Sequence, residues 1–265
     1  MKIKEIVSAL EQFAPLPLQD GFDNAGLQIG LTEVEATGAL LCLDVTEAVL
    51  DEAIALGHNL VISHHPLIFK GYKSITGKDY VERCILKAIK NDIVIYSAHT
   101  NLDNAYGGVN YKIAEKIGLK NLQVLEPKEN SLQDDLMQAG AGIVGELDEP
   151  ETELEFLKRI KKTFEVGCVR HNRLTGREIQ KVALCGGAGA FLLPQAIRAG
   201  ADVFITGEIK YHDYFGHEGD ILMAEIGHYE SEQYTKEIFY SIIRDLFPNF
   251  ALQSSKINTN PIKYL

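Results

Sequence analysis

The chain has 265 residues, enough for one or two domains with a large core, and its composition is that of an ordinary globular protein. Asp and Glu number 37 against 26 Lys and Arg, which gives a net charge of -11 at pH 7. This charge, with no Lys- or Arg-rich block, disfavours nucleic acid and anionic membranes as partners, and no apolar stretch approaches the roughly 20 residues that span a bilayer.

The N-terminus and the cysteines predict a cytoplasmic protein. Residues 1–7 have the charged, amphipathic pattern of a helix and lack the apolar core and cleavage site of a signal peptide. The four cysteines are widely spaced and form no Cys-x-x-Cys pair, so we interpret them as buried free thiols in a reducing compartment: Cys42, Cys84, Cys168 and Cys185.

Helical and strand-like segments alternate in the first half of the chain. A first helix ends near Phe13, and a loop rich in turn formers covers residues 20–26. Beyond it we predict strands at 38–44, 60–62 and 93–97 and helices at 47–56, 80–90 and about 108–117. Thr46 caps the first of these helices and Gly57 ends it. This alternation is typical of a mostly parallel sheet with helices packed on it.

A domain junction is predicted at residues 127–138, which are polar and lack a strong period. After this segment we predict strands at 140–146, 166–170, 182–185 and 221–224, a helix at 151–163, and a last helix that runs from Tyr229 through Ile243. The second half is therefore also expected to be α/β.

Two segments of the chain resemble each other. Residues 41–65 align without a gap on residues 184–208 at a shift of 143 positions, and both copies read strand, helix, glycine, strand, polar end. We interpret the match as an ancient duplication, with convergence on a common βαβ pattern as the alternative. In this register His65 corresponds to Glu208, and His212 lies just beyond it.

Two histidines follow the buried strand at 60–62, in the sequence Ser63-His64-His65-Pro66. In an open α/β sheet, ligands bind at the carboxyl ends of the strands, where loops converge. Pro66 favours an extended backbone at His65, so we expect the two rings to diverge and to serve two different centres. The alternative is a pair of surface or capping histidines.

Two further groups follow predicted strands. Asp103 lies four residues after His99 and could bind a divalent cation while His99 supports it, or could instead start a turn or cap a helix. His228 and Glu232 share one face of a first helical turn, so an imidazole and a carboxylate can reach the same ion. Acidic residues that merely favour the helix dipole are the alternative here.

Together these groups supply three nitrogens and two carboxylates, a set that suits two divalent ions such as zinc, manganese or iron. Five protein ligands for two centres leave coordination positions for water, as hydrolytic chemistry requires. The Gly186-Gly187-Ala188-Gly189 turn lacks a dinucleotide fingerprint because Leu192 occupies the third glycine position. We interpret it as a tight turn, with an anion held at the helix start as the alternative.

With these residues assembled, the chain resembles the NIF-three-like family, often labelled GTP cyclohydrolase 1 type 2 homologues, over almost its whole length. The motifs that carry the resemblance are, in order, Phe22-Asp23-Asn24-Ala25-Gly26-Leu27-Gln28-Ile29-Gly30, Ser63-His64-His65-Pro66, His99-Thr100-Asn101-Leu102-Asp103, Gly186-Gly187-Ala188-Gly189, Thr206-Gly207-Glu208 with His212, and Gly227-His228 with Glu232. The family usually has Trp at the position of Phe22, and the extra middle domain of its longer members has no room in this chain.

The resemblance implies two similar three-layer α/β domains with mixed, mostly parallel sheets and a dinuclear metal site near their junction. The first domain would comprise residues 1–125 and 235–265, and the second residues 126–234. The resemblance also implies two divalent ions per subunit, a ring-shaped homohexamer, and Glu232 as a bridging ligand. The implied metal ligands are His64, His65, Asp103, His228 and Glu232.

We therefore expect a metal-dependent hydrolase of a small, nucleotide-like or phosphorylated substrate, with purine-ring opening of the GTP cyclohydrolase type as one version. Glu208, His212 and His99 are the candidates for proton transfer. The rival interpretation is a non-catalytic metal-binding scaffold or adaptor, because family members are associated with transcription-factor interaction and a fold does not fix a reaction. An enzyme should keep polar groups such as Asp44 close to the metals, whereas a scaffold need not.

Overall fold

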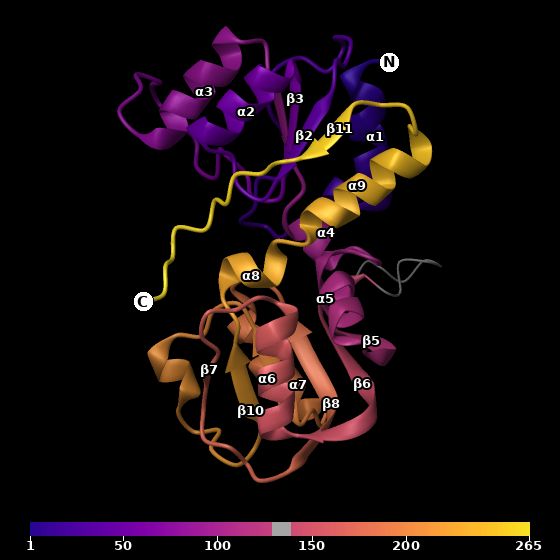
Figure 1. Ribbon diagram of the computed structural model, residues 1–265, viewed down its shortest axis with the longest axis vertical. Helices are drawn as coiled ribbons and strands as arrows, with labels where there is room; N and C mark the ends of the chain where they lie inside the picture. Colours follow the sequence, from indigo (N-terminus) through magenta and orange to yellow (C-terminus); the bar gives the residue numbers. More distant parts are fainter. Residues whose placement is uncertain (129–138) are drawn as a thin grey trace. The chain divides into compact units, whose positions relative to one another are not determined.

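The computed structural model describes residues 1–128 and 139–265, and it forms two compact units, each with its own sheet (Figure 1). Unit 1 is Met1–Leu102 with Thr235–Pro261, and unit 2 is Asp103–Tyr234 with Ile262–Leu265. The sequence had grouped residues 103–125 with the first unit. They lie in unit 2 because α5 (Val109–Ile117) and β5 (Lys120–Pro127) contact β6 (Gly140–Thr152). Most of the predicted junction, residues 129–138, lies outside the described residues.

Unit 1 has three layers, a mostly parallel sheet and a pair of helices on each of its two faces. The strand order is β1 (Gly26–Ile29), β4 (Val94–Ser97), β3 (Leu60–Ser63), β2 (Ala39–Cys42), β11 (Leu252–Ser254), and only the β1–β4 pair is antiparallel. Helices α2 (Glu47–Leu56) and α3 (Tyr80–Lys90) pack together on one side, and α1 (Ile3–Phe13) and α9 (Thr235–Leu246) on the other (Figure 1). The C-terminal β11 thus completes the N-terminal sheet.

Local sequence signals explain the helices and strands of unit 1. The Thr46 side chain accepts a hydrogen bond from Val49 N, and Gly57 ends α2 with a φ of 69°, so the predicted bounds of α2 are confirmed. Strands β2, β3 and β4 are buried at every position, as expected for strands covered on both faces. Two short elements are η1 (Leu16–Leu18) and α4 (Thr100–Asn104), and the boundary between the two units falls within α4.

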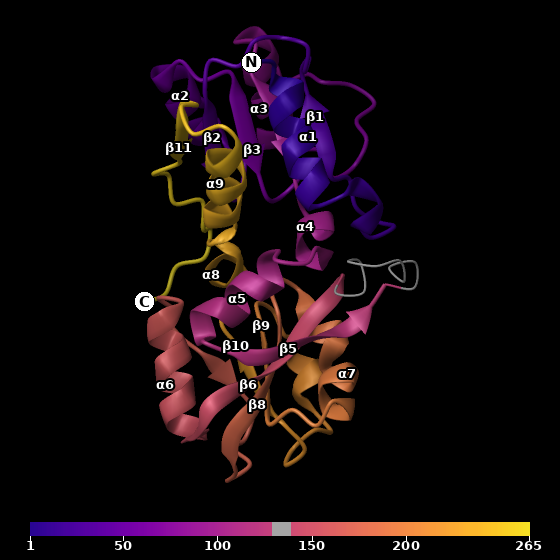
Figure 2. The ribbon, with the colours of Figure 1, turned by 90° about the vertical axis from the view of Figure 1, so that its right-hand side faces the viewer.

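Unit 2 has a mixed sheet in which the parallel pairs are a minority. The order is β5, β6, β8 (Glu178–Cys185), β9 (Val203–Thr206), β10 (Leu222–Glu225), β7 (Arg170–His171), and only β8–β9 and β9–β10 are parallel. The expectation of a mostly parallel sheet therefore holds for unit 1 and is wrong for unit 2, whose outer strands pair without crossover helices. Helices α6 (Glu153–Thr163) and α7 (Leu193–Arg198) cover opposite faces (Figure 2).

The two similar segments fold into βαβ units with the same strand register. In unit 1, Ala39 pairs with Leu60 and Cys42 with Ser63. The pairs found 143 positions later, Val182 with Val203 and Cys185 with Thr206, are also partners in unit 2. The intervening helix of unit 2 begins as η3 (Gly189–Leu192) and continues as α7, and the glycines that end the helical stretches have φ angles of 69° and 71°. This shared register supports the duplication interpretation.

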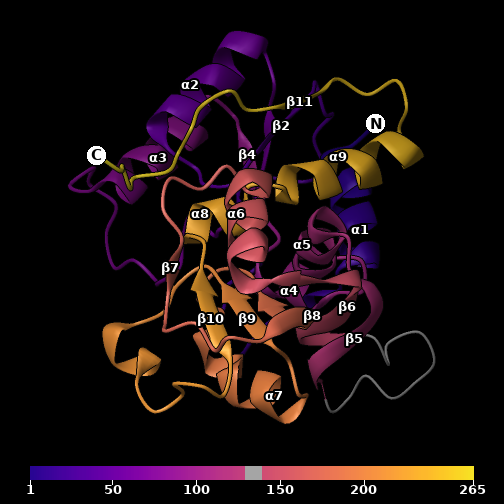
Figure 3. The same cartoon turned by 60° about the horizontal axis from the view of Figure 1, so that its bottom comes forward.

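Three predictions from the sequence are corrected by the structure. The helix expected from Tyr229 onward is two helices, α8 (His228–Glu232) and α9, because α8 packs in unit 2 whereas Phe239 and its neighbours bury in unit 1. The strand expected at 166–170 is confined to β7, which pairs with β10 at the sheet edge (Figure 3). Cys168 is exposed, whereas the other three free cysteines are buried.

No helix among the described residues is long and apolar enough to cross a membrane.

A buried carboxylate fixes the loop before α3. Glu82 is fully buried, and its Oε2 accepts hydrogen bonds from the backbone N–H groups of Thr76 (2.8 Å), Gly77 (2.9 Å) and Lys78 (3.1 Å). These backbone hydrogen bonds lower the pKa of Glu82 from 4.5 to about 2, against the opposing effect of burial.

We expect Glu82→Gln to lower the thermal unfolding temperature and to flatten its dependence on acid. Because the folded-state pKa lies below the ordinary one, the carboxylate contributes stability that is complete above pH 4.5 and is lost as pH falls through about 2. Thermal unfolding of both proteins across this window measures the effect. The control is Glu178→Gln, which removes an exposed carboxylate of β8. Equal shifts in the two variants would contradict this role of Glu82.

Candidate metal centre

The sequence-predicted metal ligands belong to two groups, one in each unit. His64 and His65 follow β3 in unit 1, and Asp103, His228 and Glu232 belong to unit 2. In unit 1 the ends of β3 and β4 are adjacent because Ser63 pairs with Ser97 in a parallel ladder, so residues that follow the two strands lie together.

His64, His65 and His99 form what we call the histidine cluster. Each offers one ring nitrogen, and these three atoms lie within 4.8 Å of one another. The ring centroids of His64 and His65 are 4.9 Å apart, and the assignment of these two rings to two different metal centres stays a prediction. The backbone turns after Ser63, since the N–H groups of His64 and His65 both donate to the carbonyl oxygen of Leu43. Three imidazoles thus converge at the carboxyl end of two neighbouring strands.

Each ring of the histidine cluster is anchored through Nδ1. The acceptors are the Ala98 carbonyl for His64 (2.8 Å), Asp44 Oδ1 for His65 (2.7 Å) and Asp23 Oδ1 for His99 (2.8 Å). A neutral imidazole that donates from Nδ1 carries its lone pair on Nε2. This is the arrangement in which metal-binding histidines are oriented by a carboxylate or a backbone carbonyl.

Two carboxylates support the histidine cluster, and the sequence assigned neither of them to a histidine. Asp23 accepts hydrogen bonds from His99 and from the backbone N–H and hydroxyl of Thr100. Although burial raises the pKa of Asp23, these hydrogen bonds lower it to about 2, so the carboxylate is ionised. Burial also raises the pKa of Asp44, but the hydrogen bond from His65 outweighs it and the pKa is lowered. The only sequence signal for Asp23 was its place in the first family motif.

The unit 2 group is centred on Glu232, which is 3% exposed. Its Oε2 lies 3.1 Å from His228 Nε2, as the i, i+4 spacing predicted. A carboxylate oxygen of Asp103 lies within 4.8 Å of one from Glu232. His228 Nδ1 hydrogen bonds to Glu208 Oε1 at 2.8 Å, so this ring is also anchored through Nδ1. We call Asp103, His228 and Glu232 the acidic cluster.

The Gly186–Gly189 turn packs directly against the acidic cluster. Gly187 has a φ of 59°, and a Cβ placed on it would lie 2.3 Å from Glu232 Oε1 and 3.4 Å from His228 Nε2. The Gly187 N–H donates to Ser231 Oγ at 3.0 Å, which ties the turn to α8. The turn therefore needs glycine because a side chain would occupy the position of the Glu232 carboxylate.

The three candidates for proton transfer occupy different surroundings. His99 belongs to the histidine cluster, and Glu208 contacts His228. His212 lies in η4 (Tyr211–Tyr214), where its ring centroid is 5.2 Å from that of Tyr211 and 6.1 Å from that of Phe215. Among the described residues, no hydrogen bond or ring contact joins His212 to either cluster.

The chain is similar to known proteins over nearly its whole length. The family model described as Duf34/NIF3 (NGG1p interacting factor 3) matches residues 1–261. A Clostridium perfringens protein named GTP cyclohydrolase 1 type 2 homolog is 38% identical over 235 residues, which cover 88% of this chain and 87% of that one. A Lactococcus lactis protein of the same name is 34% identical, with 98% of both chains covered.

Solved structures share the fold over nearly the whole chain. A Staphylococcus aureus hypothetical protein has a TM-score of 0.90 at 32% identity, with 100% of this chain and 99% of that chain covered. A Bacillus cereus protein related to NIF3 gives 0.89 at 27% identity and the same coverage. Reduced HcgD from Methanocaldococcus jannaschii gives 0.79 at 27% identity, with 97% of this chain and 98% of that chain covered.

We expect Gly187→Ala to weaken divalent-metal binding at least tenfold while lowering stability only modestly. A Cβ at Gly187 displaces the flexible end of Glu232, and a positive φ costs a non-glycine residue about 1–2 kcal/mol. The matched control is Gly200→Ala, which has a φ of 71° and open space around its Cβ. Metal titration and thermal unfolding of both variants measure the difference. Equal metal affinities in the two variants would show that the Gly187 contact does not position Glu232.

Proposed function

The chain belongs to the Duf34/NIF3 family, and we propose that it is a hydrolase that uses two divalent metal ions. In this proposal the histidine cluster and the acidic cluster act together. The ligands are those expected from the sequence: His64, His65, Asp103, His228 and Glu232. Zinc, manganese and iron suit such a mixture of imidazoles and carboxylates.

The observation that supports the proposal best is the uniform anchoring of the three histidine ligands. In His64, His65 and His228 the Nδ1 atom is bonded to an oxygen, which leaves Nε2 as the ligating atom in each. Histidines that merely cap a turn have no reason to share one orientation of the ring. The residues present therefore fit divalent ions by the chemistry and the orientation of their donors.

Bound divalent ions would lower the pKa of water and polarise an electrophile, which is the chemistry that hydrolysis needs. The chain's own residues hold the ligands in place and move protons. Asp44 and Glu208 orient His65 and His228, and the Glu208 side chain is 58% exposed, so it can also exchange a proton with a substrate. In the histidine cluster the candidate for proton transfer is His99, which the ionised Asp23 holds in place.

The proposed substrate is small and nucleotide-like or phosphorylated. This choice rests on the family resemblance and on the name GTP cyclohydrolase 1 type 2 homolog carried by the relatives, so purine-ring opening is one version of the reaction. His212 is the weakest of the proton-transfer candidates, because its ring contacts are with Tyr211 and Phe215.

We also propose a ring-shaped homohexamer, which the mass of the native assembly in light scattering would test.

We expect the purified protein to bind two divalent ions per chain and the Glu232→Ala variant to lose at least one of them. Asp44→Asn should lower metal affinity by about 10–100-fold, since it removes the anionic acceptor that orients His65. Asp51→Asn, which removes an exposed carboxylate paired with Lys87, is the control and should bind as the wild type does. Metal analysis with competitive titration gives both quantities, and a wild-type stoichiometry of one would refute the dinuclear site.

We expect the metal-loaded protein to hydrolyse at least one compound in a panel of nucleotides, phosphoesters and amides. Glu208→Gln and His99→Ala should lower kcat by about 10²–10⁴-fold if these groups move protons, and His65→Ala should abolish turnover. Product formation by the Glu208 and His99 variants is measured at full metal occupancy, and that of His65→Ala at the metal concentration that saturates the wild type. A fully loaded wild type that turns over nothing in the panel would reject the hydrolase and favour the metal-binding scaffold.

A further inference from the structure

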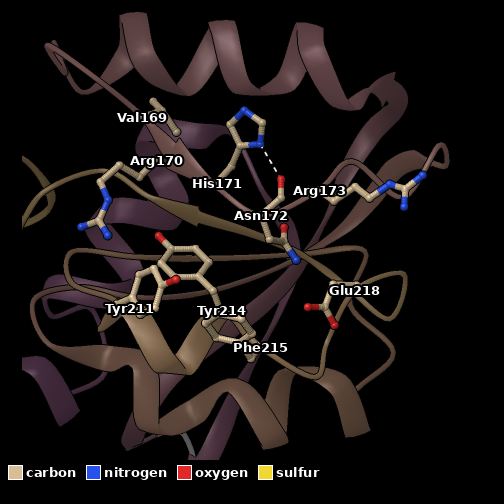
Figure 4. Close-up of a pocket in the computed structure, with 9 residues that line it drawn as sticks. All are labelled: Val169, Arg170, His171, Asn172, Arg173, Tyr211, Tyr214, Phe215 and Glu218. Carbon is tan, nitrogen blue, oxygen red and sulfur yellow. Dashed lines mark hydrogen bonds between the residues drawn. The ribbon is translucent and has the colours of Figure 1, made fainter.

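Unit 2 contains a cavity of about 630 Å³ that the candidate metal centre does not use (Figure 4). Residues 169–173, which include β7, form one wall, and η4 with the residues that follow it forms the other. The volume lies within the range of about 300–1,000 Å³ that is usual for small-molecule sites. The cavity can therefore hold one mid-sized ligand.

The η4 wall of the cavity is aromatic. Tyr211, Tyr214 and Phe215 line it, and the ring centroids of Tyr211 and Phe215 are 5.3 Å apart. Tyr211 is 68% exposed and Phe215 is 55% exposed, which is unusual for large aromatic side chains. Tyr214 is fixed by a hydrogen bond from its hydroxyl to Glu225 Oε2 at 3.1 Å. Such a wall offers ring faces on which a planar ligand can stack.

The opposite wall carries two arginines. Arg170 lies over the Tyr214 ring at 5.7 Å and donates one hydrogen bond to Glu225 Oε1 at 2.8 Å, so most of its five donors are not used by that pair. Arg173 is exposed and forms no ion pair with any of the described residues. Glu218 is the one carboxylate that lines the cavity, and it accepts a hydrogen bond from Gly216 N. Two arginines and one carboxylate thus line the cavity, and Arg170 is also paired with Glu225.

Hydrogen bonds within unit 2 hold the walls of the cavity in place. The Asn172 side chain donates to the Ile221 carbonyl at 3.0 Å and accepts from Met223 N at 2.9 Å, which holds the arginine wall against the edge of the sheet. Glu225, at the end of β10, holds both Arg170 and Tyr214 and so fixes the two walls relative to each other. A site whose walls are held in this way loses little conformational entropy when a ligand binds.

We propose that this cavity binds a nucleoside monophosphate, with the base stacked on the Phe215 ring, to which the Tyr211 ring is inclined by 67°, and the phosphate at Arg170 and Arg173. The exposed aromatic faces favour a planar ring, and the arginines favour an anion with several acceptor oxygens. Glu218 can accept a hydrogen bond from an amino group of the base. A quaternary ammonium ligand also suits an aromatic wall, but two guanidinium groups oppose it. The proposal does not depend on the hydrolase function, because no metal ligand lines the cavity.

The test is calorimetric titration of the full-length protein with the four ribonucleoside monophosphates. The monophosphate that binds most tightly is then compared with its nucleoside and with ribose 5-phosphate. The nucleoside and ribose 5-phosphate are each expected to bind at least roughly tenfold more weakly than the monophosphate. Arg173→Gln should weaken the nucleotide roughly tenfold without changing the nucleoside. Phe215→Leu should weaken the nucleotide and the nucleoside alike.

Matched controls come from the same unit. Arg198→Gln removes an exposed arginine outside the cavity, and Phe191→Leu removes a phenylalanine that is 59% exposed elsewhere. Both controls should bind as the wild type does, and so should Glu232→Ala, since the phosphate does not need the acidic cluster. The proposal is overturned if no nucleotide binds at millimolar concentration or if the cavity variants match their controls. It is also overturned if Glu232→Ala alone abolishes binding, because the nucleotide would then occupy the candidate metal centre.

Discussion

The hydrogen bond at Nδ1 is the interaction on which the candidate centre depends. An imidazole can rotate and can change its tautomer, so a histidine is a defined ligand only when its other nitrogen is held. Here the Ala98 carbonyl, Asp44 and Glu208 hold the three proposed ligands. These acceptors come from segments distant in sequence from the histidines they hold. The fold must therefore form before the donors are oriented, which distinguishes a built site from a chance grouping of histidines.

The parallel pairing of the strands brings these acceptors to the carboxyl ends of the strands in each sheet. Asp44 follows β2, the histidine doublet follows β3, and His99 follows β4, in three neighbouring strands of one ladder. In unit 2 the Gly186 turn, Glu208 and His228 follow β8, β9 and β10 in the same way. The βαβ units of the two halves share one strand register, so equivalent strand ends carry the candidate residues in both. In unit 1 the strand end carries the imidazoles of His64 and His65, and in unit 2 it carries the carboxylate of Glu208.

The sequence predicted the structural features that depend on residues close to one another in the chain. The bounds of α2 and α3 followed from capping and periodicity, and the i, i+4 contact of His228 with Glu232 followed from helix geometry. The break between α8 and α9 was missed because an apolar period continues across it while the two helices bury their faces in different units. The role of Asp23 was missed because its partner His99 lies 76 residues away. Such pairings are set by tertiary structure, which a local pattern does not encode.

Glu225 explains how the cavity of unit 2 and the acidic cluster share one strand end. Its carboxylate accepts hydrogen bonds from Tyr214 and Arg170 in the cavity walls and from the backbone N–H of Ile209. Ile209 follows Glu208, the residue that anchors His228, and His228 itself lies three residues after Glu225. The cavity and the His228 ring are thus connected through a short chain of hydrogen bonds and peptide bonds.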